Sequence, residues 1–112
     1  IKVVYSSFIY NIIIDYNKIQ SYGFVKNVLD LEPLNKKFKS FGFEVSEVNG
    51  HDIHELKRNF LKFTKQKIKK SSITICHTIK GKGFKVAENN PNWHHRNSFS
   101  EDEVKMINES LK

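Results

Sequence analysis

The sequence lacks most of the features that mark secreted or membrane proteins. Its 112 residues include one cysteine, Cys76, which cannot form an intramolecular disulfide. The apolar stretch over residues 1–14 is too short to span a bilayer, and it has neither the positive start nor the cleavage site of a signal peptide. We find no internal repeat and no low-complexity segment. We therefore expect one domain with one core and no internal boundary, in a reducing cytoplasm and away from membranes.

The charge is strongly positive but is not patterned for nucleic acid. A formal charge of +7 raises the question of an anionic partner. Many of the basic residues lie on or just after one predicted helix: Lys57, Lys62, Lys65, Lys67, Lys69 and Lys70. No aromatic residues alternate with them, as a stacking platform for bases would need. We interpret these lysines as a solvated helical face and expect no nucleic-acid partner.

The first half of the chain alternates between strand and helix patterns. Three isoleucines ending in an acid, Ile12–Asp15, predict a parallel strand buried on both faces. A helix that Gly42 closes is predicted next, with its apolar face at Leu31, Leu34, Phe38 and Phe41. A strand is then expected over residues 43–48, followed by a turn at Asn49-Gly50.

The second half continues the alternation. Asp52 is placed to cap a second helix, whose predicted core positions are Ile53, Leu56, Phe60 and Phe63. Ser72–Thr78 predicts a third strand with Cys76 buried in it, and Gly81 and Gly83 then open a long polar loop to Arg96. Ser100 to Glu103 forms a capping box for a last helix. The order predicts an α/β fold, a parallel sheet with helices on both faces.

Polar residues follow two of the predicted strands. Asp15-x-Asn17 offers oxygen ligands for Mg²⁺ or Ca²⁺, but the same residues are common turn formers and helix caps. Lys80-Gly81-Lys82-Gly83 combines ammonium groups with flexible backbone, which suits phosphate and equally suits a basic flexible loop. Local chemistry therefore leaves open whether Asp15-x-Asn17 is a cation site or a turn, and whether residues 80–83 are a phosphate site or a flexible loop.

The histidines and possible nucleophiles allow fewer readings. The segment Trp93-His94-His95-Arg96 suits a metal site, a proton-transfer site or an exposed loop. For zinc the ligand set is too thin, and His51 and His54 are most simply capping or surface residues. Cys76 lies in mid-strand and no serine has a nucleophile-elbow pattern, so serine and cysteine catalysis are set aside.

Five segments together carry a resemblance to a known family. They are DYNKIQSYG, LEPLNKKFKSFGFEV, NGHD, HTIKGKG and ENNPNWH, and they run in order from residue 15 to residue 94. In this order and spacing they closely resemble the amino-terminal section of transketolases, in the branch where the enzyme is made as two shorter chains. The resemblance implies the carboxy-terminal part of a thiamine-diphosphate-binding domain.

The resemblance also implies roles for particular residues. Transketolases move a two-carbon ketol unit between sugar phosphates, using thiamine diphosphate and a divalent cation. Asn17 resembles a cation ligand through its side-chain oxygen, and Ile19 resembles one through its backbone carbonyl. His94 resembles the histidine that faces the cofactor and the donor sugar, Lys80 matches a lysine near that site, and Arg96 falls where relatives carry a basic residue that contacts substrate.

The chain departs from the family in two places. The family's Gly-Asp-Gly stretch, which supplies the other protein ligand of the cation, should lie about 30 residues before Asn17, the length of one strand-helix-strand unit. Only sixteen residues precede Asn17, and the triplet is absent from them. His95 also replaces a glycine. The resemblance thus implies a chain truncated at its amino end that is inactive alone and needs a carboxy-terminal section or second subunit, as in a dimeric cytoplasmic enzyme of the pentose phosphate pathway.

The sequence is also compatible with two other functions. Deoxyxylulose-phosphate synthases share the KGKG and histidine region, although the LEPL and NGHD segments favour transketolase. The second alternative is a protein without catalytic activity, either a binding module or the relic of an enzyme. The missing Gly-Asp-Gly triplet and the basic surface suggest it.

Overall fold

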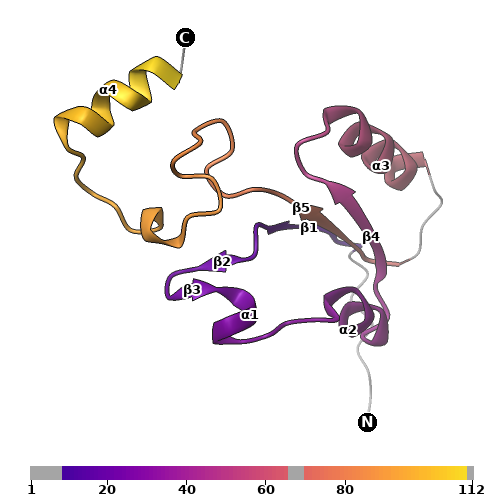
Figure 1. Cartoon of the computed structure of the whole chain (residues 1–112). Helices are drawn as coiled ribbons and strands as arrows, with labels where there is room; N and C mark the ends of the chain where they lie inside the picture. Colours follow the sequence, from indigo (N-terminus) through magenta and orange to yellow (C-terminus); the bar gives the residue numbers. More distant parts are fainter. Residues whose placement is uncertain (1–8, 66–69, 111–112) are drawn as a thin grey trace. The chain divides into compact units, whose positions relative to one another are not determined.

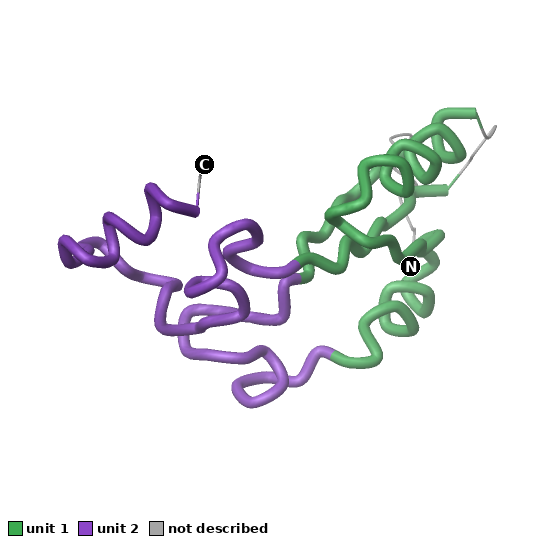
Figure 2. The backbone as a smooth tube through the Cα atoms, turned by 45° about the horizontal axis from the view of Figure 1, so that its top comes forward, with its two compact units in different colours: residues 1–16, 32–78 green, residues 17–31, 79–112 purple. Residues whose placement is uncertain are grey.

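The computed structural model describes residues 9–65 and 70–110, and the chain divides into two compact units (Figure 2). Unit 1 takes its described residues from 1–16 and 32–78, and unit 2 from 17–31 and 79–112. The buried apolar cluster of Tyr16, Leu34, Ile73 and Ile75 lies in unit 1, and the expectation of a single domain stays a prediction. The segments that leave the sheet after Tyr16 and after Thr78 pack mainly among themselves.

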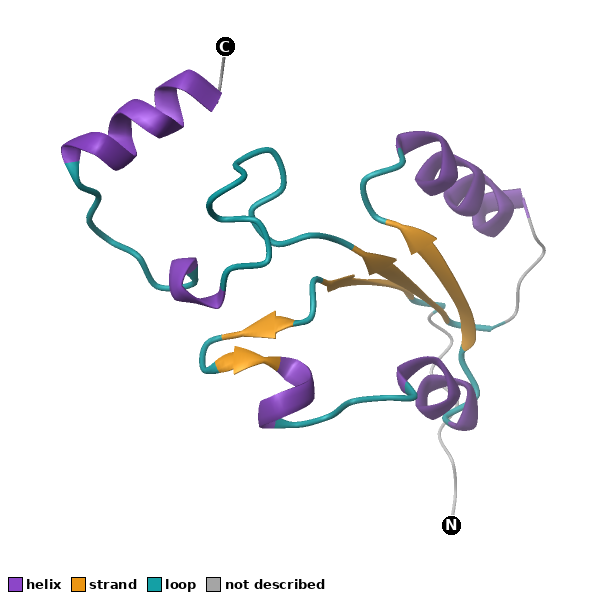
Figure 3. Ribbon diagram, viewed as in Figure 1, coloured by secondary structure: helices purple, strands orange, loops and turns teal. Residues whose placement is uncertain are grey.

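A parallel sheet forms the centre of unit 1 (Figures 1 and 3). Its strands are β1 (Asn11–Tyr16), β4 (Glu44–Asn49) and β5 (Ser72–His77), in the order β1-β5-β4, and both pairings are parallel. Every side chain of β5 except the last is buried, as a strand with neighbours on both sides should be. The predicted α/β fold with a parallel sheet is confirmed.

One face of the sheet packs against α2 (Leu34–Ser40). Leu34 lies in the core with Ile73 and Ile75, which are each 1 % exposed, and Phe38 packs against this cluster. The helix ends where predicted, because Gly42 adopts a φ of +89° and its N–H donates to the Lys39 carbonyl at 3.0 Å. It begins at Leu34 rather than Leu31.

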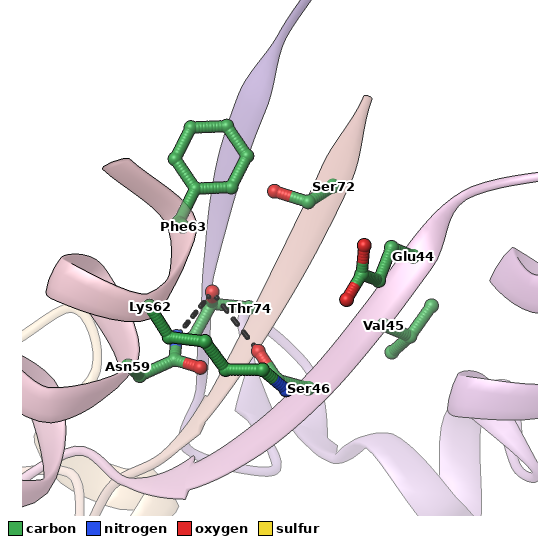
Figure 4. A pocket seen from close by; sticks show the side chains of 8 residues that line it. All are labelled: Glu44, Val45, Ser46, Asn59, Lys62, Phe63, Ser72 and Thr74. Atoms are coloured by element: carbon green, nitrogen blue, oxygen red, sulfur yellow. Dashed lines mark hydrogen bonds between the residues drawn. The ribbon is translucent and has the colours of Figure 1, made fainter. Parts of the chain in front are cut away.

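The opposite face of the sheet is polar where α3 (Ile53–Lys65) lies on it (Figure 4). Asn59 donates to the Thr74 hydroxyl at 2.8 Å, and the Thr74 hydroxyl lies 3.3 Å from that of Ser46. Asp52 caps the helix as expected, since its carboxylate accepts from the N–H groups of the second and third helical residues. Helices therefore cover both faces of the sheet, as the sequence predicted.

Several predicted core positions are exposed. Ile13 of β1 is 66 % exposed and Ile53 of α3 is 69 % exposed, so β1 is not buried on both faces. Phe41 and Phe60 are likewise open to solvent. Periodicity identified the apolar side of each element but not what would cover it, and part of the sheet surface beneath α3 carries the hydroxyls of Ser46 and Thr74.

Unit 2 contains a hairpin that the sequence patterns did not predict (Figure 3). It is formed by β2 (Ile19–Gln20) and β3 (Gly23–Phe24), which pair antiparallel, and α1 (Val25–Val28) follows directly. Strands of two residues are shorter than any alternation that can be recognised in a sequence.

The last helix of unit 2, α4 (Glu101–Ser110), begins with the predicted capping box. Ser100 Oγ accepts from the Glu103 N–H at 3.2 Å, and Glu103 Oε2 accepts from the Ser100 N–H at 2.9 Å. Before it, a turn of 3₁₀ helix, η1 (Pro91–Trp93), interrupts the polar loop.

The lysines of α3 are exposed, as expected of a solvated face: Lys57, Lys62 and Lys65, with Lys70 beyond the helix. Lys67 and Lys69 lie outside the described residues, and so does the part of the predicted amino-terminal apolar segment over residues 1–8. In the described ranges, 9–65 and 70–110, no helix is long and apolar enough to cross a membrane.

Candidate functional site

The polar segments singled out in the sequence begin at one edge of the sheet. Tyr16 and His77, the last residues of β1 and β5, pair with each other in the parallel register. Just around them, the Thr78 hydroxyl donates to the carboxylate of Asp15. The segments that begin at Asn17 and after Thr78 therefore leave from the carboxyl edge, where α/β sheets place ligands.

A polar cluster at this edge was not recognised in the sequence. His77 Nε2 lies 2.7 Å from Glu47 Oε2, and Asn35 donates to Glu47 Oε1 at 2.5 Å. These two hydrogen bonds, His77 first, lower the pKa of the Glu47 carboxyl. The buried Tyr16 donates its hydroxyl to Glu32 at 2.7 Å. The register of β4 and β5 and the packing of α2 on the sheet bring these residues together, so no local motif could have revealed them.

Cys76, next to this cluster, is buried as predicted. Burial, and secondarily the Asp15 carboxylate, raises the pKa of its thiol. An un-ionised thiol in a central strand is unreactive, in agreement with the exclusion of cysteine catalysis.

The two predicted cation ligands lie at the start of the hairpin in unit 2. Asn17 Oδ1 accepts a hydrogen bond from the Ile19 N–H at 3.0 Å, and Lys18 between them has a φ of +65°. The Val25 N–H donates to the Lys18 carbonyl at 2.9 Å, which closes the hairpin, and the Ile19 side chain is buried. Asn17 therefore does form the turn that local chemistry suggested. An amide oxygen has a second lone pair, so this turn is compatible with a role as cation ligand.

Among residues 9–65 and 70–110, no conventional metal cluster is found. Across the part of the chain that the structure describes, no three or more His, Cys, Asp or Glu side chains lie close enough together to hold an ion. The backbone N–H groups of His51 and His54 donate to the side chains of Asn49 and Asp52, so His51 belongs to the turn before α3 and His54 to its capped first turn.

The Lys80 to Asn90 loop is closed by its own hydrogen bonds. The Asn89 N–H donates to the Lys80 carbonyl at 3.0 Å, and the Gly83 N–H donates to Glu88 Oε1 at 3.0 Å. Gly81 is required here, because a Cβ on it would lie 2.7 Å from the Ala87 carbonyl oxygen and its φ is +75°. The segment is an ordered turn rather than the flexible basic loop that local chemistry left open.

His94 follows η1 and has a polar atom without a partner. Its Nδ1 is buried and has no hydrogen bond to any residue that the structure describes. Burial, then the positive charges of Lys80 and His95, lowers the pKa of the His94 imidazole. The ring is therefore neutral near pH 7 and can accept a proton. A buried, unpaired imidazole nitrogen is uncommon in a folded protein, and the role of His94 at a ligand site stays a prediction.

Arg96, the predicted substrate contact, is already engaged by other groups. Its Nη2 lies 2.7 Å from Glu103 Oε2, and its guanidinium carbon lies 4.7 Å from the centroid of the Trp93 ring. A substrate contact for Arg96 stays a prediction.

All five residues predicted for the site lie in unit 2. Lys80 is close enough to His94 for its positive charge to lower the pKa of the imidazole, and β3 contacts η1, which precedes His94. Asn17 and Ile19 share the hairpin that contains β3. The class is therefore an α/β protein whose predicted site residues lie on segments that leave the carboxyl ends of parallel strands.

The chain belongs to the transketolase family. Residues 9–112 match the family domain described as "Transketolase, thiamine diphosphate binding domain". The predicted resemblance is thus confirmed, and it covers nearly the whole chain.

Curated relatives and a solved structure agree with this assignment. The chain is 40 % identical over 101 residues to an apulose-4-phosphate transketolase subunit of Actinobacillus succinogenes, covering 90 % of this chain and 36 % of that protein. It is 36 % identical over 74 residues to a 6-deoxy-6-sulfo-D-fructose transketolase subunit of a Clostridium species, covering 66 % of this chain and 27 % of that protein. The crystal structure of transketolase from Campylobacter jejuni matches with a TM-score of 0.67 and 29 % identity, over 74 % of this chain and 13 % of that one. The chain therefore spans about a third of the length of these curated relatives, and less of the solved structure.

Proposed function

We propose that this chain is part of the diphosphate-binding domain of a thiamine-diphosphate-dependent transketolase that moves a two-carbon ketol unit between sugar phosphates. The observation that carries the proposal is the buried, unpaired Nδ1 of the neutral His94, close to Lys80, in a domain of this family. Thiamine diphosphate, when bound, would supply the electron sink for breaking the carbon–carbon bond.

Each site residue has a role that its surroundings support. Asn17 Oδ1 and the Ile19 carbonyl would be oxygen ligands of Mg²⁺ or Ca²⁺, which holds the diphosphate. The Lys80 ammonium adds positive charge beside an anionic ligand. His94 would move protons at the hydroxyls of the donor sugar, and its lowered pKa keeps it neutral for that task.

A further protein chain is part of the proposal. Three of the relatives are named as subunits of transketolases, which supports a partner chain or carboxy-terminal section that completes the site. The names of those relatives contain apulose-4-phosphate and 6-deoxy-6-sulfo-D-fructose, so a phosphorylated or sulfonated sugar is the substrate class to test first. The buried free thiol of Cys76 supports a reducing, cytoplasmic location.

The test is the thermal shift of the purified chain with thiamine diphosphate and Mg²⁺. A ligand that binds only the folded state raises the melting temperature by mass action, so we expect a rise that EDTA abolishes and that thiamine without the diphosphate does not produce. Asn17→Ala should lose the shift, whereas Asn17→Asp keeps an oxygen ligand and should retain it. Asn92→Ala, an exposed asparagine in the same unit, is the matched control.

Two outcomes would count against the proposal. No shift at millimolar cofactor would favour a non-catalytic module or a relic. Measurable ketol transfer by this chain alone would contradict the predicted need for a partner.

A further inference from the structure

Arg96 is held on two sides by groups of this chain. Its Nη2 forms an ion pair with Glu103 Oε2 at 2.7 Å, and the two side chains are 33 % and 25 % exposed. Its guanidinium also lies 4.7 Å from the centre of the Trp93 ring and 5.8 Å from that of Phe99. Planar guanidinium groups favour such a combination of a carboxylate and aromatic faces.

The carboxylate that binds Arg96 also begins α4. Glu103 Oε2 accepts from the Ser100 N–H at 2.9 Å as well as from Arg96. The Ser100 N–H, ahead of Arg96, lowers the pKa of the Glu103 carboxyl, which therefore stays ionised. Glu103 Oε2 thus both caps the start of α4 and holds the guanidinium of Arg96.

The aromatic partner of Arg96, Trp93, lies next to the predicted site residue His94. Trp93 immediately precedes His94, and its ring stacks on Phe99 with centroids 5.6 Å apart and meets the edge of Phe84 at 5.1 Å. Phe84 belongs to the loop that begins at Lys80. Trp93 therefore joins the lysine loop, the histidine segment and the stretch before α4.

We propose that Arg96 is a positioning residue: bound by Glu103 and stacked on Trp93, it fixes the segment that carries His94 against the first turn of α4. Arg96 acts on the site through its contact with Trp93. This role rests on the proposed function of His94 and extends it to residues outside the site.

Variants of the full chain test the role. Trp93 is the only tryptophan, so its emission and its quenching by acrylamide report on this segment. Arg96→Gln and Glu103→Gln each remove one charge of the pair, and Arg96→Lys keeps the charge without the planar stacking surface. Asp102→Asn is the matched control, because it removes a carboxylate from the same helical turn and breaks only the exposed pair with Lys105 at 3.7 Å.

Arg96→Gln and Glu103→Gln should raise the quenching constant of Trp93 and weaken the affinity for thiamine diphosphate with Mg²⁺, each by about two- to five-fold, as expected for a partly exposed ion pair. The double variant should be no worse than either single one, because both break the same contact. Arg96→Lys should fall between wild type and Arg96→Gln. The far-UV melting curve should stay close to that of the wild type.

Two results would overturn the inference. One is an Arg96→Gln chain in which acrylamide quenches Trp93 as in the wild type. This holds also when that variant loses affinity for sugar phosphate. The other is an Asp102→Asn chain that changes as much as Glu103→Gln. The quenching measurements need no cofactor, so they decide the positioning role even if the wild type fails to bind thiamine diphosphate and the proposed function falls.

Discussion

Gly50 lies in the turn between β4 and α3, where a side chain would have no room. Its N–H donates to the His77 carbonyl at 2.8 Å. A Cβ on Gly50 would overlap the methyl group of Thr78 and lie 3.2 Å from both Cys76 Cβ and His77 O. Its φ is outside the left-handed region, so Gly50→Ala isolates the steric cost of close packing from backbone strain.

The structure indicates the size of the effect. Thr78 is β-branched and its hydroxyl is bound to Asp15, so its methyl cannot rotate away without breaking that hydrogen bond. We expect Gly50→Ala to lower the free energy of unfolding by about 1–3 kcal/mol, the usual range for overpacking. Thr78→Ser removes the methyl and keeps the hydroxyl. It should restore about 1 kcal/mol or more in the Gly50→Ala background.

Urea denaturation of four chains, followed by circular dichroism, measures this effect. The chains are the wild type, Gly50→Ala, Thr78→Ser and the double variant, and the coupling energy is the quantity of interest. The two remaining contacts at 3.2 Å should keep the double variant less stable than Thr78→Ser alone. A coupling energy of zero, or a Gly50→Ala chain as stable as the wild type, would refute the packing described for this turn.

Three further predictions concern the loops and the strand-end cluster. Gly81→Ala should destabilise by about 1 kcal/mol or more beyond Gly83→Ala in thermal unfolding, because both carry a positive φ but only the first adds a backbone clash; equal costs would contradict it. Ser100→Ala should cost about 1 kcal/mol through loss of the helix cap, measured by helical ellipticity and unfolding, and an unchanged helix would count against the cap. The pKa of Glu47 is lower in the folded chain than its ordinary value of 4.5, so ionised Glu47 stabilises the fold at pH values above 4.5. This stabilisation is lost as the pH falls through the lower pKa of the folded chain. Unfolding of Glu47→Gln should therefore depend less on pH below 4.5, whereas a pH profile identical to the wild type would show that the contact with His77 and its neighbours is not formed.

Local sequence patterns predicted the main strands and helices in their order, and the motifs predicted the family. Three strands and three of the helices were predicted in the right places, because apolar periodicity and the caps at Asp52 and Ser100 are local signals. The family match over residues 9–112 likewise follows from motifs that can be read along the chain. The roles of Asn17 and His94 came from the same motifs, and they stay predictions.

The contacts of each apolar face and polar side chain depend on the tertiary structure. Ile13 and Ile53 lie on well-patterned elements and are nevertheless exposed, because burial depends on the opposing surface and not on spacing. Arg96 is a basic residue in a loop by sequence, and the folded conformation of residues 93–103 decides that its guanidinium contacts Glu103 and Trp93. His94 was singled out by motif, but its unpaired buried nitrogen and lowered pKa arise from the surrounding fold. Local signals specify helices and strands because backbone hydrogen bonding and apolar periodicity act over a few residues. The burial of a side chain and the pKa of a buried group also depend on residues that are distant in sequence.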